Sequence, residues 1–210
     1  MTQSTFEVRH KYEDTILYRG EAENFKKFIE RLVRDKKSLC NIKIEGEDLS
    51  GINLSGAKLR GSYLYRVNLS NADLTGADLT DVGIHNSNLT GVDLYCADLI
   101  AAVLASVDLT GACLAGASFV GAYIQDVILT GAKLNWSSHQ LMSILLLKEA
   151  GCDIEKRAIA GIVAVSTDWC WRDFLEVDYP GKDWALGVLR GYIVEGDTHP
   201  EELDEEIANV

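Results

Sequence analysis

The sequence has few prolines, no long hydrophobic run and no apolar segment at its amino terminus. Only two prolines occur in 210 residues, which excludes proline-rich disorder and collagen. The longest apolar runs, near residues 141–147 and 159–165, are too short to span a bilayer. The first ten residues, MTQSTFEVRH, lack the apolar core of a secretory signal. The sequence therefore predicts a cytoplasmic protein without a membrane partner.

Side chains that bind metals or act as nucleophiles are few and scattered. None of the four histidines lies near cysteines or carboxylates at the spacing of a metal site. The serines of Ser137-Ser138-His139 are better explained by a helix cap than by a nucleophile, and Cys170, between two tryptophans, by a core position. We therefore expect no enzyme, no metal and no cofactor. An odd number of cysteines without a close pair predicts free thiols: Cys40, Cys96, Cys113, Cys152 and Cys170.

Acidic side chains outnumber Lys and Arg by 32 to 20, giving a formal net charge of −12. Such a charge disfavours nucleic acid as a direct ligand. The balance changes along the chain, with ten basic and eight acidic residues in 1–46, four and nine in 47–136, and six and fifteen in 137–210. The pattern of residue types along the sequence changes at the same points. We therefore predict three domains: 1–46, 47–136 and 137–210, the last with an acidic tail.

Residues 47–136 carry a five-residue repeat. Leu, Ile or Phe occupies a central position at eighteen consecutive steps of five, from Leu49 to Leu134, and the residue two before it is usually Ala or Val. Residues two apart on an extended chain face the same side, so both point into one interior. The residue two after the centre is Gly in nine steps and Asn or Asp in four, and these accept turn conformations. Short strands joined by corners predict a narrow solenoid.

The motifs NADLT, GADLT, CADLI and SVDLT resemble the A(D/N)LXX pattern of the pentapeptide repeat family. The resemblance covers residues 47–136 and implies a mainly β fold, a right-handed quadrilateral β-helix with twenty residues in each coil. Eighteen repeats then make about four and a half coils. One internal feature agrees with a step of twenty. The polar residue before the centre is replaced at Tyr63, Gly83, Val103 and Tyr123.

Both ends of such a solenoid expose strand edges and need caps. Residues 6–21 predict a β-hairpin turning at Glu13-Asp14, residues 23–37 a helix, and the phase of the repeat starts the first coil near Leu39. After Trp136 a bundle of about four helices is expected, with Ser137 and Gln140 capping the first and Asp153 the second. The predicted spans are 137–151, 154–166, 168–177 and 182–194, followed by the acidic tail 201–210, helical or disordered.

One candidate surface is an acidic ladder. A step of twenty places Asp73 beside Asp93 on one face, and Asp78 beside Asp98 on the next. Some family members protect DNA gyrase or related type II topoisomerases by DNA mimicry, so the resemblance implies that the ladder contacts a basic partner. The alternative is that Asp or Asn before the centre is a preference of the repeat itself. Basic residues on a third face, Lys58 and Arg60, dilute the ladder.

A second candidate surface is the face where the repeat loses its polar residues. Exposed apolar and aromatic groups that cluster usually mark a contact, and three occupants remain open: a partner protein, a second copy in a homodimer, or the chain's own terminal helices. The sequence therefore predicts a non-enzymatic protein–protein interaction or scaffold module, with a DNA-mimicking topoisomerase regulator as the alternative. The residues of this face are Tyr63, Tyr65, His85, Val103, Ala105 and Tyr123, with Ile100 and Val120 on the neighbouring face.

Overall fold

The computed structural model contains two compact units. The first unit comprises Met1–Cys113 and Ala117–Ala132, and the second comprises Leu114–Gly116 and Lys133–Val210. Trp136, Ser137, most of the predicted third helix and the acidic tail lie outside the described residues. The structure describes residues 3–135, 138–165, 173–174, 176–190 and 192.

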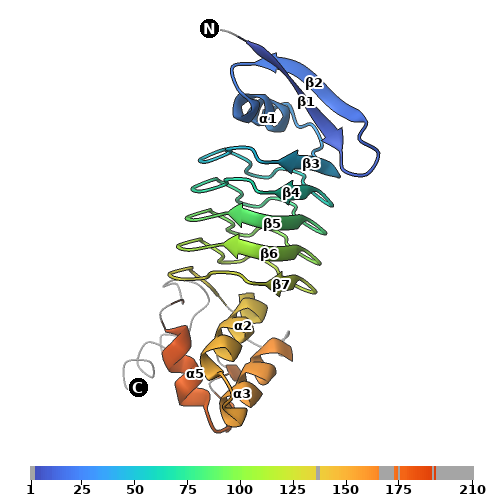
Figure 1. Ribbon diagram of the computed structural model, residues 1–210. Helices are drawn as coiled ribbons and strands as arrows, with labels where there is room; N and C mark the ends of the chain where they lie inside the picture. Colours follow the sequence, from blue (N-terminus) through green and yellow to red (C-terminus); the bar gives the residue numbers. More distant parts are fainter. Residues whose placement is uncertain (1–2, 136–137, 166–172, 175, 191, 193–210) are drawn as a thin grey trace. The chain divides into compact units, whose positions relative to one another are not determined.

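The first unit is a β-solenoid in which each coil contributes one short strand to a parallel ladder (Figure 1). Successive strands pair with an offset of twenty residues, so Leu64 lies beside Ile84 and Ile84 beside Leu104. The twenty-residue step predicted for one coil is therefore confirmed. The five strands are β3 (Ile42–Glu45), β4 (Tyr63–Tyr65), β5 (Gly83–Asn88), β6 (Val103–Asp108) and β7 (Tyr123–Gln125).

Each coil turns at the residue two after the central position, where the backbone is left-handed. The sequence predicted corners at Gly, Asn and Asp, and the structure has φ between 53° and 57° at Arg66, Cys96, Ala101 and Ser106 as well. Hydrogen bonds between coils hold these residues in place. The Ala101 amide, for example, donates to the Val120 carbonyl at 2.8 Å. The ladder therefore imposes the corner even where the side chain disfavours it.

Substitutions at two corner glycines can distinguish the effect of backbone strain on stability from the effect of side-chain crowding. Gly76 and Gly91 have φ of +62° and +65°, but an added Cβ would meet nothing within 4 Å at Gly76 and would lie 2.6 Å from Asn71 Oδ1 at Gly91. We expect Gly76→Ala to lower the free energy of unfolding by about 1 kcal/mol, and Gly91→Ala to lower it further. Urea denaturation followed by circular dichroism measures both. Ala101→Gly is the reverse control and should stabilise; equal losses at the two glycines would contradict the crowding.

The interior of the coils is filled by the central leucines and the small residues two before them. Two of these small positions hold serine, and both Ser62 and Ser87 are buried. The Ser62 hydroxyl donates to the Leu39 carbonyl at 2.7 Å and accepts from the Ile42 amide at 3.3 Å. Ser62 thus provides a buried hydrogen-bond partner for two backbone groups of the preceding coil.

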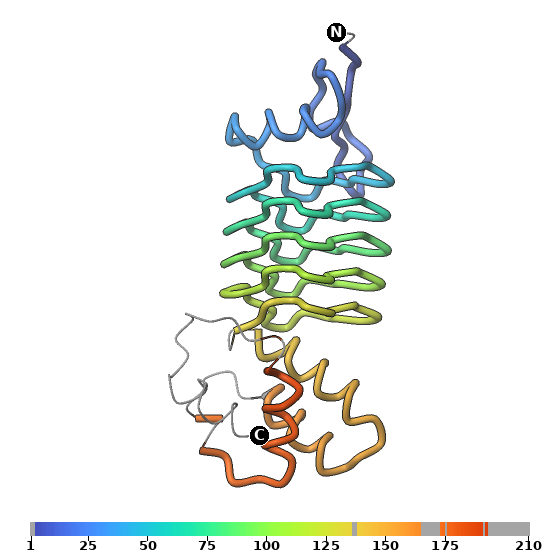
Figure 2. The backbone as a smooth tube through the Cα atoms, turned by 90° about the vertical axis from the view of Figure 1, so that its left-hand side faces the viewer, coloured from blue at the N-terminus to red at the C-terminus, as the bar shows by residue number. Residues whose placement is uncertain are grey.

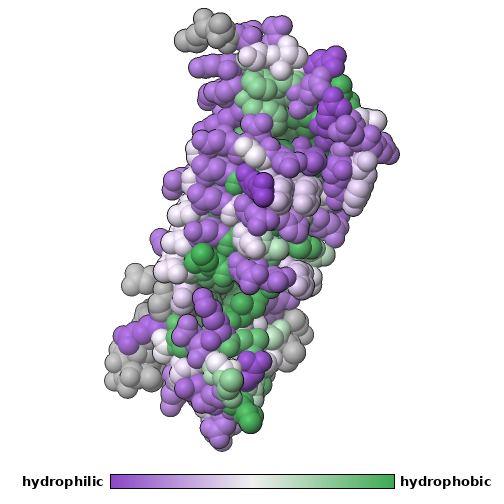
Figure 3. Space-filling model, in the orientation of Figure 1, coloured by the Kyte–Doolittle hydropathy of each residue, from purple (hydrophilic) through white to green (hydrophobic). Residues whose placement is uncertain are grey.

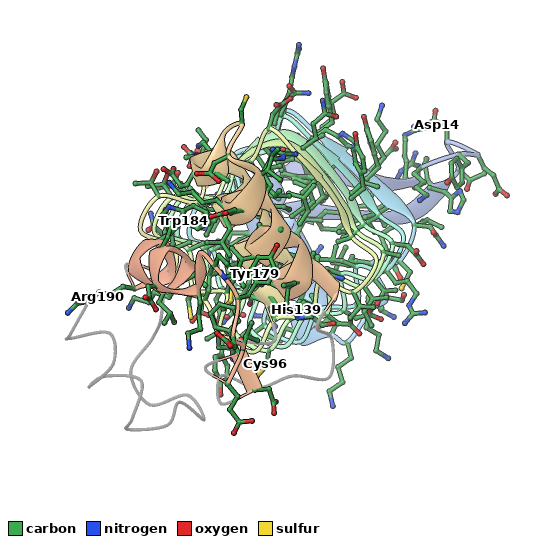
Figure 4. The ribbon with its side chains drawn as sticks, turned by 90° about the horizontal axis from the view of Figure 1, so that it is seen from below. Asp14, Cys96, His139, Tyr179, Trp184 and Arg190 are labelled. Carbon is green, nitrogen blue, oxygen red and sulfur yellow. The ribbon has the colours of Figure 1, made fainter. Side chains whose placement is uncertain are left out.

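A β-hairpin extends the ladder at its amino-terminal end. Strands β1 (Ser4–His10) and β2 (Ile16–Ala22) pair antiparallel, and β1 also pairs with β3. The result is one seven-stranded sheet in the order β2-β1-β3-β4-β5-β6-β7. The hairpin turns where predicted, and Figure 4 shows Asp14 at its tip, outside the outline of the coils. Hydrogen bonds from Arg19, which has the larger effect, and from Arg9 hold the pKa of the Glu7 carboxyl below its ordinary value.

Helix α1 (Phe25–Arg34) follows the hairpin and lies over the first coil (Figures 1 and 2). It begins at Asn24, whose Oδ1 accepts from the Lys27 amide at 2.8 Å. Its apolar side is buried through Phe28, Ile29 and Leu32. This burial covers apolar surface that the end of the stack would otherwise expose to water.

The second unit is helical in its described part. It contains α2 (His139–Ala150), α3 (Ile154–Val165) and α5 (Lys182–Leu189). As predicted, α2 ends at Gly151, which has φ of 52°, and Asp153 caps α3 by accepting from the Lys156 amide at 3.2 Å.

Ser138 stands at the N-cap position of α2, as a helix cap was expected there, but its side chain makes no capping hydrogen bond. Its buried hydroxyl donates instead to the Leu114 carbonyl at 3.0 Å. A capping box pairs residues three apart in sequence, whereas this bond joins residues 24 apart, and only the folded chain brings them together.

Candidate interaction surface

The face predicted from the breaks in the repeat lies on the outward side of β4 to β7. Side chains alternate along each strand, and the central residue of each points inward. Parallel pairing then places equivalent residues one strand spacing apart, about 4.8 Å, in two columns. We call this surface the β4–β7 face. Its columns are Tyr63, Gly83, Val103 and Tyr123, and Tyr65, His85, Ala105 and Gln125.

Three rings gather at the β4–β5 end of this face. The Tyr63 and Tyr65 rings lie nearly parallel, with centroids 6.2 Å apart, and the His85 ring lies 5.3 Å from that of Tyr63. Gly83 makes room for them, because a Cβ there would lie 3.3 Å from the Tyr63 ring and 3.2 Å from His85 Nε2. The Arg66 guanidinium stands 5.0 Å from the centroid of the Tyr65 ring.

The β6–β7 end of the face is more apolar. Tyr123 is 58% exposed and Val120 50%, and Ile100 occupies the position equivalent to Val120 one coil earlier. Val103 is half-buried beside Tyr123 in the same column. In Figure 3 hydrophobic side chains gather over the later coils, at the level of β6 and β7, whereas hydrophilic ones dominate over the first coils. The structure thus brings the predicted residues into two neighbouring clusters.

The role of Gly83 could not be predicted from the sequence. There it stands only as a break in the polar pattern, together with Tyr63, Val103 and Tyr123. A signal was present, because Gly83 is the sole glycine among the eighteen residues that precede a central position. Its meaning required the structure, which shows two rings meeting over the missing side chain.

The four aspartates of the acidic ladder stack in register, Asp73 beside Asp93 and Asp78 beside Asp98. All four are half-buried. In each, Oδ1 accepts from the backbone N–H two residues later, at 2.9–3.1 Å. Burial tends to raise the pKa of the Asp78 carboxyl, but hydrogen bonds from Thr80 and Arg60 outweigh it and lower that pKa. These carboxylates therefore help to close the corners of the coil.

The same corner bond forms wherever the repeat has Asp or Asn before the centre. Nine residues occupy such positions, and every one accepts from the N–H two residues later at 2.9–3.1 Å. Three of the nine are asparagines, Asn53, Asn68 and Asn88, so the bond does not depend on negative charge. The stacking of acids follows in part from this local preference.

Metal-binding clusters and membrane-spanning helices were sought in the described part of the chain. Within it, no group of three or more His, Cys, Asp or Glu residues is placed to hold a metal ion. Among the described helices, none is long and apolar enough to cross a membrane. Cys96 and His139, both labelled in Figure 4, lie in different units, the former exposed and the latter 4% exposed. Cys170 lies outside the described residues.

Comparison with known proteins identifies the repeat. Residues 48–82 and 102–138 match the family of pentapeptide repeats with eight copies. The twenty-residue coil and its left-handed corners agree with this match, so the repeat segment is built from pentapeptide repeats. The predicted fold, a right-handed quadrilateral β-helix, is confirmed.

Several solved structures are similar to this chain. A pentapeptide repeat protein from the thylakoid lumen of Arabidopsis thaliana is 24% identical over 49% of this chain and 74% of its own, with a TM-score of 0.44. One from Nostoc PCC 7120 is 28% identical over 53% and 78%, with a TM-score of 0.34. QnrB1, a plasmid-mediated fluoroquinolone resistance protein, is 21% identical over 47% and 56%, with a TM-score of 0.28. No curated protein matches the sequence.

Proposed function

We propose that this protein is a non-enzymatic interaction module that binds a partner protein through the β4–β7 face. The observation that supports this proposal most is that the face lacks Asp and Asn before the central positions of its strands. Nine of the eighteen repeats place Asp or Asn before the centre, where the side chain closes a corner. Tyr63, Gly83, Val103 and Tyr123 stand at this position and have no carboxylate or amide to make the bond. A local stabilising contact has been replaced by exposed apolar and aromatic surface, which supports a role in binding.

The chemistry of the face suits a partner with an apolar patch bordered by polar groups. Tyrosine provides large contact area at low cost in side-chain entropy, and it is enriched among residues that dominate binding energies. The neighbouring strand β3 adds a charged border, where Lys43 Nζ and Glu45 Oε2 lie 2.6 Å apart. Hydrogen bonding to Glu45 raises the pKa of the Lys43 ammonium, so this border stays charged at neutral pH.

Two aspartate substitutions test the proposal. We expect Tyr123→Asp and Val103→Asp to weaken capture of the partner from host lysate by about tenfold or more, since each would leave an unpaired charge inside a desolvated contact. Quantitative pull-down measures the capture, and light scattering measures the mass of the free protein. Thr130→Asp is the matched control, because it adds the same charge at an exposed residue of another face.

The outcomes separate the occupants left open by the sequence. Loss of capture with unchanged mass supports a partner protein, whereas a fall from dimer to monomer mass would indicate a homodimer instead. Unchanged capture and unchanged mass in both variants would contradict an intermolecular contact at this face. That result would leave the chain's own helices as the remaining occupant.

The alternative function, a DNA mimic acting on a type II topoisomerase such as DNA gyrase, has less support. Each of the four ladder carboxylates already accepts a backbone N–H, and Asp78 also accepts from Arg60 Nε at 3.3 Å. Their stacking nevertheless concentrates negative charge, which favours a basic partner. A supercoiling assay tests this function. Absence of any effect on gyrase activity or quinolone poisoning at micromolar protein would remove it.

A further inference from the structure

A basic cleft lies between α1 and the first coil, within the first unit. Its volume is about 730 Å³, inside the range of about 300–1,000 Å³ that is typical of small-molecule sites. One wall comes from the end of α1 and the loop that follows it, and the other from residues 53–58 of the coil. None of its lining residues belongs to the β4–β7 face. Four cationic side chains line it: Arg34, Lys36, Lys37 and Lys58.

The two walls of the cleft are held together by contacts within the protein. The Lys26 ammonium donates a hydrogen bond to the Ser50 carbonyl, and the apolar side of α1 is buried. A hydrogen bond from Lys27 lowers the pKa of the Glu30 carboxyl, outweighing its partial burial, and the backbone N–H of Asn53 on the other wall acts in the same direction. The cleft is therefore a built feature of the fold and does not need a ligand to form it.

The positive charge of this cleft is largely uncompensated. Its single lining carboxylate, Glu30, already pairs with Lys27 at 2.8 Å. Among the described residues, no carboxylate lies within 4.0 Å of the ammonium group of any of the three lysines. Arg34 has only a long contact, with its Nε 4.0 Å from Asp35 Oδ1 and its side chain 74% exposed. Because charges of one sign in a cleft attract counter-ions, this arrangement points to an anionic ligand.

The two lysines that follow α1 are not needed to complete the helix. The final carbonyls of α1 accept backbone N–H groups instead: Lys36 donates to Val33 and Lys37 to Leu32, each at 2.9 Å. The side chains of both lysines therefore have no capping role and remain available to a ligand.

The rest of the lining favours a ligand with little apolar surface. Of the two apolar side chains, Ala57 is only 4% exposed and Val33 is half-buried. Asn53 and Ser55 are exposed and offer polar groups. Gly56 adds no side chain, and a Cβ there would meet nothing within 4 Å. Affinity must therefore come from charge and hydrogen bonds rather than from apolar burial.

We propose that this basic cleft binds a small molecule that carries two or more phosphate groups. A phosphate group carries more charge than a carboxylate and has three strong acceptor oxygens, which suits the donors of Lys and Arg. The four cations come from three segments, namely the last turn of α1, the following loop and the coil. A single phosphate can reach only part of them, whereas linked phosphates can contact both walls together. This site is independent of the partner binding proposed for the β4–β7 face.

Calorimetric titration of the full-length chain in metal-free buffer tests the ligand class. Inorganic tripolyphosphate should bind with a Kd about tenfold lower than that of inorganic phosphate, because its linked groups bind together. Adenosine triphosphate should match tripolyphosphate within about threefold, since no aromatic side chain lines the cleft to stack on a base. Tight binding of adenosine triphosphate without measurable binding of tripolyphosphate would overturn the proposal, because recognition would then depend on the nucleoside.

Replacing the lysines tests the location of the site. We expect Lys36→Gln, Lys37→Gln and Lys58→Gln together to raise the Kd for tripolyphosphate about tenfold, because each removes one exposed ion pair with the ligand. Raising the salt from about 0.02 to 0.3 M should weaken binding similarly.

A second triple variant separates the cleft from total charge. Lys133→Gln, Lys148→Gln and Arg190→Gln remove the same charge at exposed residues that do not line the cleft. They should leave the Kd within about twofold at about 0.15 M salt. Equal weakening by the two triple variants would show that net charge alone attracts the anion, and the cleft would then have no part in binding.

A pair of variants at Gly56 tests the cleft without removing a lysine. Gly56 has φ of +63°, a conformation that Asn and Asp adopt more readily than most side chains. Gly56→Asp adds a carboxylate to the lining and should raise the Kd about fivefold, whereas Gly56→Asn, of nearly the same shape, should stay within about twofold. Equal affinities of the two variants would contradict binding in the cleft. Binding of hexaglutamate as tight as that of tripolyphosphate would also refute the proposal, since it would indicate an acidic peptide as the ligand.

Discussion

Replacing Phe119 with alanine is expected to lower the free energy of unfolding by about 3–5 kcal/mol. Phe119 occupies a central position of the repeat and is fully buried. The coil cannot collapse around the missing ring, because its backbone is held on both sides. The Leu99 amide donates to the Ser118 carbonyl at 2.8 Å, and the Ala122 amide to the Phe119 carbonyl at 2.9 Å. Chemical denaturation followed by circular dichroism measures the loss.

The adjacent residue provides a matched control for this substitution. Val120 is 50% exposed, so Val120→Ala removes apolar atoms from the surface of the same coil. We expect it to change the free energy of unfolding by no more than about 0.5 kcal/mol. If Phe119→Ala cost less than about 1 kcal/mol, the rigid, closely packed interior inferred for the coils would be wrong.

Replacing Ser62 with alanine is expected to cost about 1–3 kcal/mol, although it makes the interior more apolar. The substitution removes both partners of a buried hydroxyl, leaving the Leu39 carbonyl and the Ile42 amide without their bonds to it. The penalty is the desolvation of these backbone groups, which water cannot reach to compensate. Denaturation measures the total loss, and faster hydrogen exchange at the Ile42 amide would locate it in the first coil.

Ser55 is the control for Ser62. Its hydroxyl bonds the Thr75 carbonyl at 3.3 Å, but the residue is exposed and water can replace the bond. Ser55→Ala should therefore lie within about 0.5 kcal/mol of the unmodified protein. Equal effects at Ser55 and Ser62 would show that the buried hydroxyl is not required by the coil.

Much of the solenoid could be predicted because its stabilising pattern is local and repeated. The central apolar residue recurs at all eighteen steps and is Leu in fifteen of them, and Gly, Asn or Asp stands two residues after it in thirteen, so most steps carry the same local pattern. The corner at Ala101 shows the limit of that rule. Nothing in an alanine favours positive φ, and the left-handed backbone there follows from its hydrogen bond to the next coil.

The candidate sites, too, could be predicted from the sequence only in part. Periodicity was enough to place Tyr63 and Tyr123 in one column, since a step of twenty is a statement about sequence. It could not show that the rings of Tyr63 and His85 meet over Gly83, because ring packing depends on side-chain conformation. Periodicity also could not decide whether Asp73 contacts a basic partner or serves the repeat itself. The bond from the Thr75 amide to Asp73 appears only in the folded corner.

The sequence by itself determined the repeat, its period, the resemblance to pentapeptide repeats and the face on which the polar pattern fails, because all of these depend on residues at regular spacing along the chain. The tertiary structure alone showed that Arg66, Cys96, Ala101 and Ser106 also turn corners, and why Ser62 is buried. It also showed that the segment ending α1 lies beside the first coil, so that Lys36, Lys37 and Lys58 line one cleft. No periodic signal records that approach, since it is produced by packing between segments of unrelated sequence.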